Sequence, residues 1–202
     1  MELAELLEIG MKFHGHKCPA MPLGLRAGVA AMKALGDVNR AQDKELFLVA
    51  ETGKNHAAGC FLDGLMMATG CTYGKSNIEK LYYNKMAFTL IDINRQQAVR
   101  VSLKPDFFGQ MMQSPFVMQR KNGILPQDIP AEIADPLVEK VMSLPVDDFL
   151  VIGSVENYEF KQEKGIFATA CCSQCGERGF VNKLVDGPQG VICMGCLKKN
   201  AA

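Results

Sequence analysis

The chain has 202 residues, of which 48% are hydrophobic, with 22 basic and 22 acidic side chains. This composition predicts a globular protein and excludes a disordered chain. The balanced charge gives no reason to expect nucleic acid as the main partner, and no apolar run approaches the length of a membrane span. The acidic start, Met1–Glu5, differs from a secretory signal, so we expect a cytoplasmic protein.

Hydrophobic spacing and breaker residues predict the order of the elements. Leucines along residues 3–11 indicate an amphipathic helix that ends before Gly15, and Pro22 suits the first turn of a second helix. Small residues along that second helix let another backbone approach closely, so we expect it to be buried and central. The predicted elements are helices at 3–11 and 22–35, a strand at 45–51, a helix at 57–68, paired antiparallel strands at 88–93 and 99–103, a helix at 107–120 interrupted by Pro115, a helix at 131–143 and a strand at 149–155.

The irregular alternation of strands and helices favours an α+β fold, with a mixed or antiparallel sheet packed against helices. We expect a core domain over residues 1–165 and a small C-terminal domain over 166–202 that contains four cysteines in zinc-finger spacing. The charged stretch 156–165 is the expected junction between the two domains.

The C-terminal cysteines have the spacing of a structural zinc site. Two C-x-x-C pairs, Cys172 with Cys175 and Cys193 with Cys196, flank a predicted strand at 180–186 and a turn at 187–190. A reducing cytoplasm favours metal ligands over disulfides for such thiols. This segment has too little apolar surface for a core of its own, so we expect the metal to supply its folding free energy.

A second candidate metal site lies near the N-terminus. His14, His16 and Cys18 alternate along the chain, and in an extended segment they would share one face. Gly15 and Pro19 disfavour a helix here, and Cys18 precedes a predicted helix N-terminus, which stabilises a thiolate. These donors suit a second zinc ion or another transition metal in the core domain.

Two further segments supply chemistry. On a helix, Cys60 and Asp63 lie one turn apart, so Cys60 could complete the metal site and Asp63 could act as a base. The glycine-rich loop that ends at Lys75 offers amide groups and a cation to an anion. The candidate catalytic residues are therefore Cys18, Asp63, Cys71 and Lys75, and the candidate ligands of the second metal are His14, His16, Cys18 and Cys60. Taken singly, Cys71 and Cys171 are typical of small buried hydrophobic residues, and His56 is typical of a loop histidine without a special role.

Several motifs together resemble the FmdE family of formylmethanofuran dehydrogenase proteins. They are Phe-His-Gly-His-Lys-Cys-Pro at 13–19, Leu-Gly-Leu-Arg at 23–26, Cys60-x-x-Asp63 and Thr-Gly-Cys-Thr-Tyr-Gly-Lys at 69–75. The terminal Cys-x-x-Cys pairs resemble the zinc finger that many members have. Ala20 departs from the family, which commonly has glycine after Cys-Pro.

The resemblance implies a dimeric α+β protein whose cysteine–histidine cluster lines a site. It also implies association with the molybdenum or tungsten enzyme that fixes carbon dioxide as formylmethanofuran, in which other subunits carry the redox chemistry. We therefore expect a metal-binding protein similar to the accessory FmdE component of that enzyme, with protein partners in a redox enzyme complex. The sequence leaves open whether the core site is catalytic or purely structural.

The alternative function is a regulatory or interaction protein that acts through its zinc finger. Residues 171–200 carry four basic and two acidic side chains, and a zinc ion with four thiolates contributes about −2, which cancels this excess. The module therefore favours a protein contact over DNA.

Overall fold

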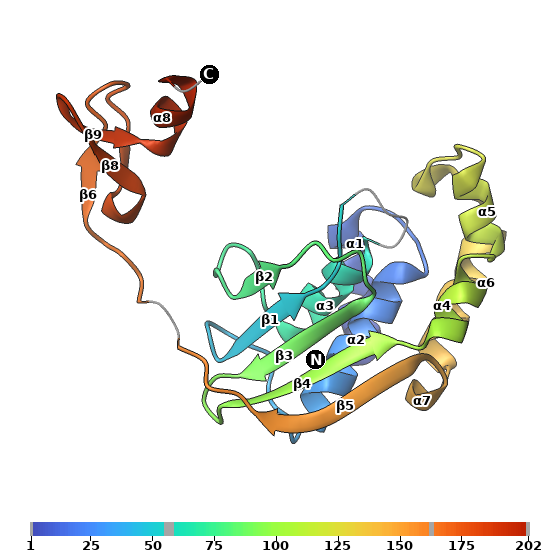
Figure 1. Cartoon of the computed structure of the whole chain (residues 1–202). Helices are drawn as coiled ribbons and strands as arrows, with labels where there is room; N and C mark the ends of the chain where they lie inside the picture. The colour runs from blue at the N-terminus through green and yellow to red at the C-terminus, as the bar shows by residue number, and fades with distance from the viewer. Residues whose placement is uncertain (1, 55–58, 162–163, 201–202) are drawn as a thin grey trace. The chain divides into compact units, whose positions relative to one another are not determined.

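A five-stranded mixed sheet forms the framework of the first 160 residues (Figure 1). The strand order is β2-β1-β3-β4-β5, in which β1 and β2 are parallel and every other neighbouring pair is antiparallel. The strands are β1 (Leu46–Ala50), β2 (Ile78–Lys80), β3 (Ala87–Asp92), β4 (Gln97–Leu103) and β5 (Leu150–Asn157). The mixed sheet with its helices confirms the predicted α+β class, and the predicted β3–β4 pair is present.

The computed structural model describes residues 2–54, 59–161 and 164–200. The chain divides into two units, a core unit at Met1–Phe160 and a C-terminal unit at Lys161–Ala202. In the core unit the helices are α1 (Leu3–His14), α2 (Ala20–Ala34), α3 (Phe61–Thr69), α4 (Pro105–Met111), α5 (Pro115–Lys121), α6 (Ala131–Ser143) and α7 (Val146–Phe149), with a 3-10 turn at Pro126–Asp128. Within the described residues, no helix is both long and apolar enough to cross a membrane.

Helix α2 is the central helix of the core unit, as its small residues predict. It packs on α3 and on strands β3, β4 and β5, and Leu23, Ala27 and Ala31 have no exposed surface. Figure 1 shows α1, α2 and α3 together on one side of the sheet. One sheet face therefore supports the three helices whose ends carry the candidate metal ligands.

Two glycines set the close approach of α2 and α3. A Cβ atom at Gly24 would lie 1.9 Å from the Phe61 carbonyl oxygen, and one at Gly64 would lie 2.0 Å from the Met21 carbonyl oxygen. Real Cβ atoms do not come so near backbone atoms, so only glycine allows this packing. The contact fixes the N-terminal end of α3 beside the first turns of α2.

Helix boundaries follow the sequence signals in the second half of the core unit. The interruption predicted at Pro115 separates α4 from α5, where Ser114 caps α5 by accepting a hydrogen bond from the Val117 amide. The helix predicted at 131–143 is confirmed as α6. The helix predicted from residue 57 begins as α3 at Phe61, while residues 57 and 58 lie outside the described part of the chain.

The C-terminal unit contains two short hairpins and a helix. Its elements are β6 (Thr169–Cys171), β7 (Arg178–Phe180), a 3-10 turn (Val181–Lys183), β8 (Leu184–Gly187), β9 (Gly190–Cys193) and α8 (Met194–Asn200). The single strand predicted at 180–186 is wrong, because the 3-10 turn divides it into the end of β7 and the start of β8. The predicted turn at 187–190 connects β8 to β9.

Candidate metal centre

Four candidate metal ligands, His14, His16, Cys18 and Cys60, are here called the N-terminal cluster. His14 lies in the last turn of α1. Gly15 follows it in the left-handed region at φ 90°, and its amide donates to the Met11 carbonyl oxygen over 3.0 Å, which ends the helix. The predicted extended segment from His14 to Cys18 is therefore wrong at its first residue. The turn at Gly15, and not the alternation of an extended chain, brings His16 and Cys18 back toward His14.

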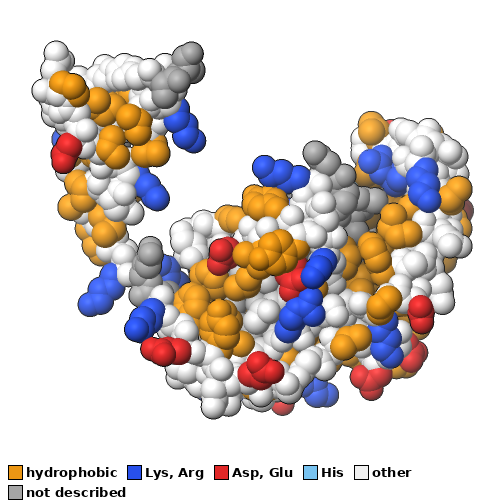
Figure 2. All heavy atoms as spheres, in the orientation of Figure 1, with side chains coloured by type: hydrophobic (Ala, Val, Ile, Leu, Met, Phe, Trp, Pro, Cys, Tyr) orange, Lys and Arg blue, Asp and Glu red, His pale blue; other side chains and the backbone are white. Residues whose placement is uncertain are grey.

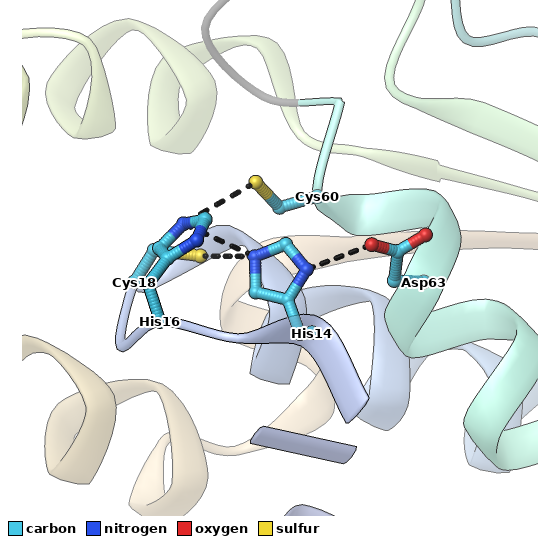
Figure 3. A network of polar contacts seen from close by, with 5 residues as sticks. All are labelled: His14, His16, Cys18, Cys60 and Asp63. Carbon is cyan, nitrogen blue, oxygen red and sulfur yellow. Dashed lines mark hydrogen bonds and ion pairs between the residues drawn. The ribbon is translucent and has the colours of Figure 1, made fainter. Parts of the chain in front are cut away.

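The cluster joins donors from two distant parts of the chain (Figure 3). His14 Nε2 lies 3.1 Å from His16 Nε2 and 3.6 Å from Cys18 Sγ. Cys60, the residue that precedes α3, places its Sγ 3.8 Å from His16 Nε2. The four ligand atoms all lie within 4.8 Å of one another. The structure thus brings together the four residues proposed as ligands of the core site.

These distances fit the edges of a tetrahedral metal site. A zinc ion with Zn–N of about 2.1 Å and Zn–S of about 2.3 Å separates two nitrogens by about 3.4 Å and a nitrogen from a sulfur by about 3.6 Å. The nitrogen pair of the cluster is 3.1 Å apart, and its two nitrogen–sulfur contacts are 3.6 and 3.8 Å. Two imidazoles and two thiols also suit a metal of intermediate softness. The residues present can therefore hold such an ion.

Asp63 fixes the orientation of His14. Its Oδ2 atom lies 2.7 Å from His14 Nδ1, which leaves Nε2 directed at the cluster (Figure 3). A carboxylate in this position sets the tautomer of a metal-binding histidine and makes it a stronger ligand. The hydrogen bond to Asp63, followed by that to Cys60, raises the pKa of His14 to about 9. In the absence of metal His14 is therefore protonated at neutral pH, and metal binding must displace that proton.

The pKa values of the two thiols of the cluster are shifted in opposite directions. The hydrogen bond from Cys60 lowers the pKa of Cys18, and the amides of Met21 and Ala20 lower it further. The same bond, followed by burial, raises the pKa of Cys60. The expected stabilisation of a Cys18 thiolate at the start of α2 thus has two sources, the neighbouring thiol and the first amides of the helix.

Cys71 and Lys75 do not lie in the cluster. Nine residues of α3, about 13 Å of helix, separate Cys60 from the loop that carries them. Cys71 is fully buried, its thiol donates to the Leu46 carbonyl oxygen over 3.5 Å, and burial raises its pKa to about 11. Lys75 Nζ donates to the carbonyl oxygens of Ala41 and Gln42. Both residues therefore make contacts that stabilise the loop after α3 and are not among the four grouped ligand residues, and their catalytic role stays a prediction.

The four C-terminal cysteines also form a cluster. Their sulfurs lie within 4.8 Å of one another, and Cys175 Sγ is 4.0 Å from Cys193 Sγ, close to the 3.8 Å or so expected around zinc. Hydrogen bonds from backbone amides, first that of Cys175, lower the pKa of Cys172 to about 6. Amides that stabilise a thiolate in this way are suited to a closed structural metal site.

Two further sequence predictions concern Cys171 and His56. Cys171 is exposed in β6, so the expectation that it is buried is wrong. His56 lies outside the described residues.

A cavity of about 340 Å³ opens beside the N-terminal cluster. His16, Cys18 and Cys60 line one part of it, and α5 contributes Arg120 and Lys121 to another. Sequence reasoning missed these two cations, because no local pattern relates the last turn of α5 to residues far earlier in the chain.

Comparison with known proteins places this site within a family. Residues 13–151 match the family model described as FmdE, molybdenum formylmethanofuran dehydrogenase operon. The chain belongs to the FmdE family. The FmdE match contains the whole N-terminal cluster, Asp63 and the two cations of α5, whereas the C-terminal cysteines lie beyond it.

Two relatives extend the comparison of this FmdE chain. A probable S-adenosyl-L-methionine-binding protein of Archaeoglobus fulgidus is 27% identical over 207 residues, which cover 96% of this chain and 53% of the relative. The chain thus spans about half the length of that relative. The crystal structure of a tungsten formylmethanofuran dehydrogenase FmdE-like protein from Syntrophus aciditrophicus has a TM-score of 0.59 at 20% identity and covers 100% of this chain and 95% of that chain. This similarity shows a shared fold.

Proposed function

We propose that the protein is a metal-binding accessory protein whose core site holds one transition metal, zinc by its donor set. The proposed ligands are His14, His16, Cys18 and Cys60, and a separate structural zinc is held by the four C-terminal cysteines. The observation that carries the proposal is the convergence of four ligand atoms from α1, the following loop and the start of α3, beside a cavity. Membership of the FmdE family supports a role beside a molybdenum or tungsten formylmethanofuran dehydrogenase.

The chain's own residues have distinct tasks at this site. Asp63 accepts the hydrogen bond from His14 Nδ1 and so keeps the metal-facing nitrogen of that ring deprotonated when metal is bound. His16, Cys18 and Cys60 border the cavity, so a ligand there would lie against the metal-binding side chains. A bound zinc ion would supply Lewis-acid chemistry toward an oxygen or sulfur atom of that ligand.

The experiment is a count of metal ions per chain. The Cys18→Ala, Cys60→Ala double variant should lose one metal ion relative to the parent protein, measured by elemental analysis after free metal has been removed. The matched control is Cys71→Ala, Cys171→Ala, which removes the same number of thiols outside both clusters and should leave the metal content unchanged. Unchanged stoichiometry in the first variant would refute the core site.

A second candidate function is binding of a protein partner through the C-terminal unit. This unit exposes large apolar side chains, among them Phe167 at 92%, Phe180 at 56% and Met194 at 40%, and Figure 2 shows hydrophobic side chains gathered on its surface. Apolar side chains of this size favour a protein over nucleic acid as the partner. Binding to DNA or RNA that weakens steeply with salt would contradict this candidate, because phosphate neutralisation produces such a dependence.

A further inference from the structure

The cavity beside the cluster has one metal-binding wall and one apolar wall. His16, Cys18 and Cys60 form the first, while Met111 and Phe116, at the end of α4 and the start of α5, belong to the second. Its volume of about 340 Å³ lies at the lower end of the range of small-molecule sites. Flexible methionine side chains adapt their shape to an apolar ligand. The space therefore suits a small molecule with a short hydrocarbon body.

The charge around the cavity is of one sign. Arg120 and Lys121 line it from the last turn of α5, and none of its described lining residues is acidic. Two cations without an acidic residue among the described lining residues, beside an apolar wall, favour an anionic ligand with an apolar part.

Both cations keep donors for such a ligand. Within the described part of the chain, Arg120 donates through Nη1 to the Ile124 carbonyl oxygen, and a guanidinium has five N–H donors in all. Lys121 Nζ donates to the Met112 carbonyl oxygen over 3.4 Å, and an ammonium group has three donors. These backbone contacts use one hydrogen of each head group, so most of the hydrogens of the two cations remain for an anion.

We propose that this cavity binds a small organic carboxylate, with its charged group on Arg120 and Lys121 and its hydrocarbon body against the wall formed by Met111 and Phe116. The fork of a guanidinium matches the two oxygens of a carboxylate. The apolar wall suits an anion with a hydrocarbon chain better than inorganic phosphate, which has no apolar part to place against it. That the body lies beside a bound metal rests on the proposed function, whereas recognition of the anion rests on Arg120, Lys121 and the apolar wall alone.

The test compares hexanoate, 1-hexanol and hexylammonium, which share a chain length and differ in charge. Their binding to the full-length protein is followed by ligand-observed NMR titration at constant ionic strength. Hexanoate should bind about tenfold or more tightly than hexanol, as expected for charge-assisted hydrogen bonds, and hexylammonium should bind most weakly. In Arg120→Gln this preference should fall severalfold, because Lys121 remains, while hexanol binding stays unchanged and shows that the cavity is intact.

Matched variants separate the proposal from general charge effects. Lys33→Gln removes one positive charge from an exposed position on α2 and should retain the preference for hexanoate, and Arg120→Lys should restore part of it. Equal binding of hexanoate and hexanol to the parent protein, no saturable binding of either, or an equal loss in Lys33→Gln would overturn the proposal.

Metal content measured on the same samples tests the proposed function separately. Selective hexanoate binding by a protein without a core metal would refute the metal site and leave the anion site standing. A metal-loaded protein without selectivity for hexanoate would refute the anion site and leave the metal site standing.

Discussion

At the residue scale, Asp63 is the side chain on which the orientation of His14 depends. Its carboxylate is the direct partner of His14 Nδ1, and His14 is almost wholly enclosed, with a side chain 6% exposed. Asp63→Asn should weaken metal binding at the core site by about 10- to 100-fold at pH 9, the range found when the partners of metal ligands are removed. Competition with a chromogenic chelator measures this affinity.

The control for Asp63 is Glu8→Gln. Glu8 pairs with Lys12 over 2.7 Å on the exposed side of α1, so its substitution removes one carboxylate of an ion pair without touching the cluster. It should leave the metal affinity unchanged. If both variants bind metal as tightly as the parent protein at pH 9, Asp63 does not support His14.

The same contact predicts how the Asp63→Asn defect varies with pH. Since the pKa of His14 is raised to about 9, metal must displace the His14 proton in the parent protein below that pH, and this proton alone lowers the apparent affinity about tenfold for each unit of pH below 9. Asp63→Asn removes the largest cause of the raised pKa, so the variant has less proton competition near pH 7. The difference in affinity should therefore be smallest near pH 7 and grow toward pH 9. A difference that is constant over this range would contradict the assigned pKa.

At the element scale, the approach of α2 to α3 connects the fold with the site. Cys18 precedes α2 and Cys60 precedes α3, so a change in the distance between these helices separates the two thiols. The contact at Gly24 and Gly64 sets this distance through backbone atoms that cannot move aside independently of their helices. The geometry of the metal ligands thus depends on glycines that make no contact with the ligands' side chains.

Gly24→Ala should destabilise the protein although alanine favours helix. The gain in helix propensity is about 1 kcal/mol, but the new Cβ would lie 1.9 Å from the Phe61 carbonyl oxygen, and overpacking of this kind costs about 1–3 kcal/mol or more. We expect a lower free energy of unfolding, measured in urea by circular dichroism because the chain has no tryptophan. Gly109→Ala on α4, where a Cβ would meet nothing within 4 Å, should be stabilising by up to about 1 kcal/mol. Equal stability of the two variants would show that the helices can move apart.

Long elements with a repeated pattern could be predicted from the sequence. The hydrophobic spacing and the breaker residues that define α6 and the β3–β4 pair are local in the sequence, so both could be predicted. Strand β2 has three residues, and its parallel pairing with β1 is decided by tertiary packing, which no local pattern reports. The C-terminal helix α8 begins among metal-site cysteines whose positions depend on the folded cluster, so it too was missed.

In the candidate site, too, only the groups of residues that lie close together in the sequence could be predicted from it. His14, His16 and Cys18 could be grouped because they are near neighbours in sequence, and Cys60 and Asp63 because they are one helical turn apart. The sequence suggested that Cys60 could complete the first group, but whether the two groups meet depends on the packing of α2 on α3, which no local pattern reports. The cations of α5 could not be predicted, since their place at the cavity depends on the path of the chain after β4.

At the scale of the whole molecule, the two units obtain their stability from different sources. The core unit has a large cluster of buried aliphatic and aromatic side chains behind its sheet. In the described residues of the C-terminal unit, the buried hydrophobic side chains are Cys172 and Cys196, which are themselves candidate metal ligands. The family match ends at residue 151, and the few buried side chains of the C-terminal unit predict that its folding depends on a metal held by its cysteine cluster.

Removal of the C-terminal metal should therefore unfold one unit and leave the other folded. Cys175→Ser, Cys193→Ser should lose one metal ion per chain, and limited proteolysis should cut residues 161–202 about tenfold faster or more, because their folding free energy comes from the metal. Residues 1–160 should remain protected and keep the core metal, as mass spectrometry and elemental analysis of the protected fragment would show.

Cys171→Ser changes an exposed cysteine next to the cluster and should behave as the parent protein. Equal protection of residues 161–202 with and without metal would mean that this unit folds by packing, and loss of the core metal in the double variant would mean that the two units do not fold independently.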